Sequence, residues 1–170
     1  FSRSRGLGDV YKRQEICQIQ QAVNITEKGF RRVLDFVKPG VWEYEIEAEF
    51  VYEFIKNRSK GFAYSPIIAS GQNSNVLHYT QNNSKCQSGD LILIDVGAEY
   101  GNYASDMTRT IPVSGKFTPR QRRVYDAVRK IGEESMKLLV PGTLIKEYNQ
   151  EVGKIMSSAL IDLGLLDTVS

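Results

Sequence analysis

Two Pro-Gly pairs, Pro39-Gly40 and Pro141-Gly142, constrain the fold most because each interrupts a helical pattern at an equivalent place. Before and after each pair, apolar residues recur every three or four positions, which is typical of helices with one buried face. Aligning the pairs gives an offset of 102 residues. The pattern predicts a repeat of helix, turn, helix and strands that stops after its second helical hairpin. The alternative is coincidence, because helical hairpins with Pro-Gly turns are frequent.

The periodicity predicts helices over 16–37, 43–58, 118–138 and about 148–163. Thr118 and Gln121 have the spacing of a capping box, and Pro119 suits the first helical position. Short strands are expected over 65–70 and 76–79, on either side of a polar loop. A strand over 91–98 and a second one ending near Val113 are expected to form a hairpin.

Composition excludes several classes of protein. Of the 170 residues 41% are hydrophobic, and apolar runs such as Leu91 to Ile94 are far shorter than the roughly 20 residues of a membrane span. Residues 1–14 carry a net charge of +3, which leaves −1 for the remainder and no basic surface for nucleic acid. These first 14 residues resemble translated cloning sequence, and we expect a non-native leader there. Without a secretory signal, a cytoplasmic location is expected.

Two aspartates in the predicted hairpin are the main candidates for chemistry. If Tyr100 and Gly101 form the turn, Asp95 lies directly opposite Asp106, where two like charges destabilise a sheet. A shared proton, a basic partner such as Arg109, or hard divalent cations could neutralise them. Strand parity turns Arg109 to the other face, which favours a metal. The alternative is an accidental pairing in which one aspartate is exposed at a strand end.

The remaining titratable candidates are few. His78 is the only histidine, which excludes zinc motifs with two histidines inside the chain. It is either a structural side chain or a neutral imidazole that donates to a carbonyl. Cys17 and Cys86 lie in no metal-ligand or redox spacing and are expected to be reduced and inert.

Three segments resemble a known family. They are Ser-Gly-Gln-Asn-Ser-Asn-Val-Leu-His-Tyr at 70–79, Gly-Asp-Leu-Ile-Leu-Ile-Asp-Val-Gly-Ala-Glu-Tyr at 89–100 and Tyr-Ala-Ser-Asp-Met-Thr-Arg-Thr at 103–110. Together they resemble the catalytic domain of Xaa-Pro aminopeptidases (aminopeptidase P), in the pita-bread superfamily with prolidase, methionyl aminopeptidase and creatinase. The resemblance implies an α+β fold in which helices pack on a curved antiparallel sheet. We expect residues 15–170 to be an N-terminal fragment of that domain, with a first repeat over 15–117 and the start of a second over 118–170.

The resemblance also implies an activity. Asp95 and Asp106 match the family's aspartates that contact two divalent metal ions, expected to be manganese. His78 matches the histidine that binds the substrate near the scissile bond and stabilises the tetrahedral intermediate. The substrate would be a peptide with proline in second position, which loses its N-terminal residue.

This chain departs from the family in its metal ligands. The family's remaining ligands, one histidine and two glutamates, have no match here, so the chain by itself is expected to be inactive. Its uncovered apolar surface should promote association into oligomers. Two alternatives are a non-catalytic pita-bread module that binds peptides or proteins, and a scaffold without any site. Retention of Asp95, Asp106 and His78 favours the enzyme.

Overall fold

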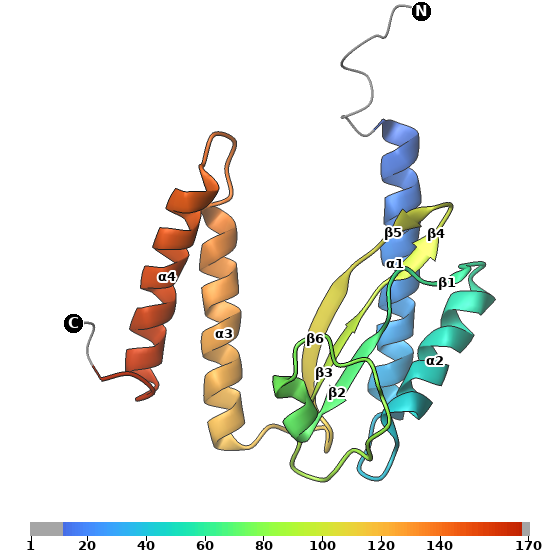
Figure 1. The fold of residues 1–170 in the computed structure, drawn as a ribbon, viewed down its shortest axis with the longest axis horizontal. Helices are drawn as coiled ribbons and strands as arrows, with labels where there is room; N and C mark the ends of the chain where they lie inside the picture. Colours follow the sequence, from blue (N-terminus) through green and yellow to red (C-terminus); the bar gives the residue numbers. More distant parts are fainter. Residues whose placement is uncertain (1–11, 168–170) are drawn as a thin grey trace, which may run out of the picture. The chain divides into compact units, whose positions relative to one another are not determined.

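The computed structural model describes residues 12–167, in two compact units whose boundary lies between Lys116 and Phe117. In the first unit, two helices precede all the strands (Figure 1). Its elements are α1 (Arg13–Phe36), α2 (Glu43–Lys56), β1 (Gly61–Phe62), β2 (Ile67–Ser70), the 3-10 helix η1 (Gly71–Asn75), β3 (Leu91–Val96), β4 (Ala98–Tyr100), β5 (Tyr103–Ala104) and β6 (Met107–Pro112). The predicted α+β class is confirmed. Of the expected leader, residues 1–11 lie outside the described residues, whereas Arg13 and Gln14 begin α1.

The strands form two antiparallel sheets of three strands each, ordered β1-β4-β5 and β2-β3-β6. One long hairpin runs through both sheets, because β3 and β4 form its outgoing side and β5 and β6 its returning side. The hairpin is bent at Gly97, which separates β3 from β4. The strand expected over 91–98 is therefore two strands, and the bend occurs where the candidate aspartates lie.

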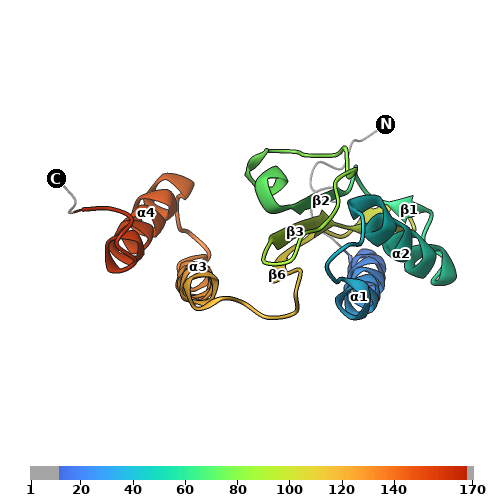
Figure 2. The same ribbon diagram turned by 90° about the horizontal axis from the view of Figure 1, so that it is seen from below.

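Helices α1 and α2 lie side by side and contact the strands (Figure 2). Their inward residues repeat every three or four positions, as expected, and the inward residues of β3 alternate. Burial of these apolar side chains is the main driving force for the unit. The core contains Ile25, Phe30, Val33, Ile46, Phe50, Phe54, Ile68, Ile92, Ile94 and Val96.

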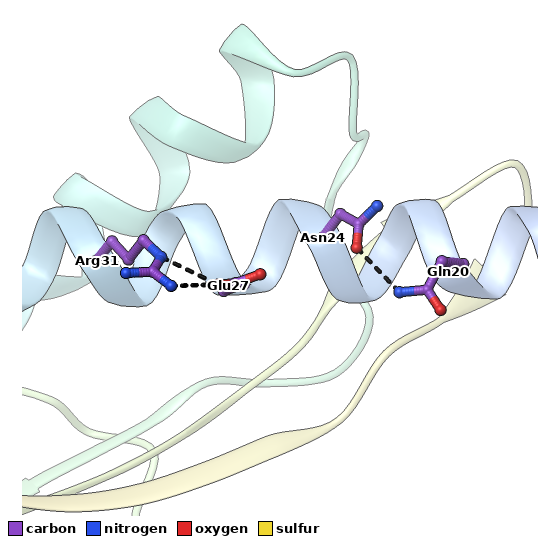
Figure 3. A network of polar contacts seen from close by, with 4 residues as sticks. All are labelled: Gln20, Asn24, Glu27 and Arg31. Carbon is purple, nitrogen blue, oxygen red and sulfur yellow. Dashed lines mark hydrogen bonds and ion pairs between the residues drawn. The ribbon is translucent and has the colours of Figure 1, made fainter.

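The outward face of α1 carries polar side chains that contact one another (Figure 3). Gln20 donates to Asn24 over 2.9 Å, and Arg31 donates to Glu27 over 2.6 Å, both one helical turn apart. Such exposed pairs contribute only about 0.3 to 0.5 kcal/mol each. This face is therefore solvated and adds little to the free energy of folding.

The second unit is a helical hairpin, α3 (Pro119–Lys137) and α4 (Ile145–Asp162). The capping box is confirmed, because Thr118 Oγ1 accepts from the Gln121 amide over 3.2 Å and the Gln121 side chain accepts from the Thr118 amide over 2.9 Å. Gly40 and Gly142 share a φ of 96°, so both Pro-Gly pairs use a backbone that glycine adopts without strain.

The strand predicted over 76–79 is wrong. Its residues form turns and irregular backbone, and His78 has a φ of 52°, in the left-handed region that a strand does not use. The loop predicted over 71–75 is the 3-10 helix η1. None of the helices between residues 12 and 167 combines the length and the apolar character needed to cross a bilayer.

Candidate functional site

The register of the hairpin differs from the prediction by two residues. The central turn residues are Gly101 and Asn102, with φ of 60° and 67°, and Tyr100 pairs with Tyr103. Two consecutive positive φ values are what a tight hairpin turn requires, and they favour Gly and Asn. Asp95 consequently pairs with Thr108 and not with Asp106. Since a shift of two preserves side-chain parity, the two aspartates still emerge on the same side.

The bend between them is fixed by close backbone contact and a buried polar cluster. A Cβ on Gly97 would lie 1.8 Å from the carbonyl oxygen of Ser105, so only glycine fits there. The Ala98 amide donates to Thr26 Oγ1 and to Ser105 Oγ, each over 2.9 Å. These two hydroxyls are 2.7 Å apart, and both residues are buried. Helix α1 thereby holds the residue that directly precedes Asp106.

Tyr64 joins the two aspartates. Its hydroxyl lies 2.7 Å from Asp95 Oδ1 and 3.0 Å from Asp106 Oδ1. Burial raises the pKa of the Tyr64 phenol, and the hydrogen bonds to Asp95 and Asp106 raise it further, so the phenol stays protonated at neutral pH. A phenol has one proton and can donate to only one carboxylate at a time. The other carboxylate therefore needs a further partner.

Among the residues that the structure describes, no cationic side chain supplies that partner. Within residues 12–167, no ion pair involves Asp95 or Asp106. Arg109 lies opposite Ile94 in the register, is exposed, and donates to the Thr108 carbonyl over 2.7 Å. Arg109 therefore does not neutralise the aspartates, in agreement with the strand parity that turns it to the other face.

All three predicted site residues line one pocket. It has a volume of about 520 Å³ and is lined by Tyr64, Ser65, Ile67, His78, Thr80, Asp95 and Asp106. His78, at its edge, and Asp106 are exposed, whereas Asp95 is half-buried and points away from the core that its neighbours Ile94 and Val96 enter. The face of β3 that carries Asp95 is half-buried along its length, whereas the opposite face is fully buried.

The pocket offers the type of ligand atom that a hard cation prefers, but too few ligands to complete the coordination shell of such an ion. Paired carboxylate oxygens are the donors that divalent cations such as Mg²⁺, Ca²⁺ and Mn²⁺ prefer. In the described part of the chain, no group of three or more His, Cys, Asp or Glu residues could hold a metal. A complete coordination shell therefore requires ligands beyond Asp95 and Asp106.

Sequence reasoning missed Tyr64. It lies 31 residues before Asp95 and 42 before Asp106, on an irregular segment between β1 and β2. No local periodicity singles it out. The one available signal is that Tyr64 stands beside strand-like sequence. A buried tyrosine usually finds a hydrogen-bond partner for its hydroxyl.

Comparisons with known proteins agree on one family. Residues 17–167 match the model of metallopeptidase family M24. The chain is 43% identical to the Xaa-Pro aminopeptidase of Haemophilus influenzae over 152 residues and 44% identical to that of Escherichia coli over 153 residues. These matches cover 89% and 90% of the chain but 35% of each relative. The chain thus spans about a third of the length of these curated relatives.

Solved structures give the same result. Proline aminopeptidase P II from Yersinia pestis superposes with a TM-score of 0.89 at 42% identity, covering 94% of this chain and 36% of that one. A zinc-substituted Escherichia coli aminopeptidase P in complex with product gives the same TM-score, identity and coverage.

Proposed function

Because the chain belongs to metallopeptidase family M24 and shares the pita-bread fold of aminopeptidase P, we propose that it forms part of an Xaa-Pro aminopeptidase. The substrate is a peptide with proline in second position, and water cleaves its first peptide bond to give the free N-terminal residue and a peptide that begins with proline. The observation that carries the proposal is that the carboxylates of Asp95 and Asp106 both contact the Tyr64 hydroxyl within one pocket.

In this proposal Asp95 and Asp106 hold two divalent metal ions together with ligands from outside the described residues. One phenol proton cannot satisfy both carboxylates, and two like charges that share one hydroxyl repel each other, which favours a bound dication. The bound ions would polarise the scissile carbonyl and activate water. Manganese is proposed on the resemblance alone.

The remaining residues have separate roles. Tyr64 keeps its proton and orients the carboxylates by donating to either of them. His78, at the pocket edge, donates from its imidazole to the oxygen that gains negative charge during peptide cleavage. Ile67 supplies an apolar wall beside these polar groups.

A hybrid enzyme tests the proposal. The chain replaces the segment that it matches in the Escherichia coli Xaa-Pro aminopeptidase, so that the relative supplies the rest of the enzyme. We expect this hybrid to cleave a peptide that begins Gly-Pro, with added manganese, and to leave a matched Gly-Ala peptide intact. Asp106→Asn should abolish the cleavage.

Two results would contradict it. A folded hybrid that binds the peptide without cleaving it would favour the non-catalytic binding module. Full activity of the Asp106→Asn hybrid would remove Asp106 from the metal site. Circular dichroism of each hybrid establishes that it is folded.

A further inference from the structure

Glu43 is a carboxylate with no exposed surface, at the first residue of α2, and it does not line the pocket. It is the common acceptor of five hydrogen bonds. All five donors belong to the segment from Ser70, which ends β2, to Ser84; we name it the 70–84 segment, and it contains η1 and His78. The donors are the Ser70 amide (2.7 Å), the Ser70 hydroxyl (2.8 Å), the Asn73 side-chain amide (3.1 Å), the Tyr79 hydroxyl (2.8 Å) and the Ser84 amide (2.9 Å).

The two oxygens of Glu43 divide the segment between them. Oε1 accepts from Ser70 and Asn73, at its beginning, whereas Oε2 accepts from Tyr79 and Ser84, at its end. The Glu43 amide also donates to the Ser84 carbonyl over 2.9 Å. One side chain thereby fixes both ends of the segment against α2.

A carboxylate is needed for these contacts. Among residues 12–167 no ion pair involves Glu43, so hydrogen bonds alone compensate its burial. Three of the donors are N–H groups, which can only donate. An apolar side chain at position 43 would leave these three N–H groups without their carboxylate acceptor. A glutamine would direct its NH2 group, which cannot accept a hydrogen bond, toward one of the two sets of donors.

The segment places His78 under backbone strain. His78 has a φ of 52°, which a non-glycine residue keeps only when its surroundings fix it. The next residue, Tyr79, is buried and donates to Glu43. We infer that Glu43 is a positioning residue that holds the 70–84 segment so that His78 faces Asp95 and Asp106 across the pocket. The function of that placement rests on the aminopeptidase activity proposed above.

The only histidine of the chain gives a direct readout. The test is a carbon-edited proton NMR spectrum of the imidazole Cε1–H, recorded on the full chain after removal of any histidine tag. Glu43→Gln should displace this resonance by more than its linewidth or split it into several. Amides of Ser70 and Ser84, which donate to Glu43, should exchange with solvent on the order of tenfold faster. Amides of Ile92 and Ile94, in β3, should be unchanged.

Glu53→Gln is the matched control, because it removes the same charge from the same helix and, within residues 12–167, the Glu53 side chain hydrogen-bonds only to Asn57 at the end of α2. Its imidazole resonance should coincide with that of the wild type. Tyr79→Phe removes only the hydroxyl that the residue after His78 donates to Glu43, and it should displace the resonance in the same way, whereas Tyr52→Phe, on the exposed side of α2, should not.

The outcomes are distinct. An unchanged imidazole resonance in a folded Glu43→Gln chain would overturn the inference. If that variant fails to fold, Tyr79→Phe decides, and an unchanged resonance there overturns it too. None of these measurements depends on peptidase activity, so failure of the proposed function leaves this result readable.

Discussion

Gly97 and Ser105 approach so closely across the bent hairpin that a Cβ on the glycine would lie 1.8 Å from the serine carbonyl oxygen. The contact joins the ends of β3 and β5. It sets the direction in which Asp106, the residue after Ser105, leaves the sheet. The separation of the two aspartates therefore depends on the absence of one methyl group.

Gly97→Ala should lower the free energy of unfolding by about 3 kcal/mol, because the backbone on both sides must move to admit the methyl group. Urea denaturation followed by circular dichroism measures the change. Gly132→Ala in α3 is the control, since a Cβ there meets nothing within 4 Å and should stabilise its helix by up to about 1 kcal/mol. Equal stability of Gly97→Ala and wild type would refute the contact.

Tyr64→Phe in the hybrid enzyme should lower turnover by roughly tenfold to a hundredfold, the range typical when a group that orients metal ligands is lost. Phenylalanine keeps the ring and removes only the hydroxyl that contacts both carboxylates. Steady-state kinetics at saturating manganese measures the loss, with Tyr125→Phe in α3 as the control. Unchanged turnover in Tyr64→Phe would show that the aspartates need no such partner.

The two thiols should differ in reactivity, so the expectation that both are inert should hold only for Cys86. Cys17 is exposed, whereas Cys86 is fully buried, and burial raises the pKa of its thiol to about 11. At pH 8 about one Cys86 in a thousand would be the reactive thiolate, even with full access to solvent. Ellman's reagent should label one thiol per native chain quickly and the second only after unfolding. Cys17→Ser should abolish the fast phase, and a fast phase that survives would contradict the burial of Cys86.

The isolated chain should not cleave Gly-Pro peptides and should bind manganese weakly, because in its described residues no group of three or more ligating side chains occurs. Isothermal titration and a peptidase assay on material free of host peptidases test both parts. Tight binding or measurable cleavage would mean that the residues within this chain suffice.

The chain should also self-associate. Helices α3 and α4 expose large apolar side chains, for instance Val128 at 60% exposure and Met136 at 67%. Exposed apolar surface of this kind promotes association. Size-exclusion chromatography with light scattering should show a mass that grows with concentration, and a sharp monomer peak at all concentrations would contradict it.

Local chemistry explains what the sequence could predict. The Pro-Gly pairs end their helices through backbone restrictions that act within a few residues. The capping box that begins at Thr118 likewise spans only four residues. A turn at Tyr100-Gly101 predicts a register that differs by two residues from the observed one, because Gly101 and Asn102 are the pair that tolerates positive φ.

Long-range contacts explain what it could not. The 70–84 segment does not form a strand because a carboxylate on α2, between 27 and 41 residues away, dictates its path. Likewise, Tyr64 reaches two aspartates that no periodic pattern connects with it. In both cases the decisive hydrogen bonds form only after the helices and strands have packed.

The second unit differs from the first in what protects its backbone. In the described chain, every fully buried apolar side chain lies at or before Val113, so α3 and α4 have no enclosed interior of their own. Hydrogen bonds of such helices open by local fluctuation and not only by global unfolding. Amide protons should therefore exchange first from α3 and α4 and last from β3, a gradient along the chain that also sets where a protease would make its first cuts.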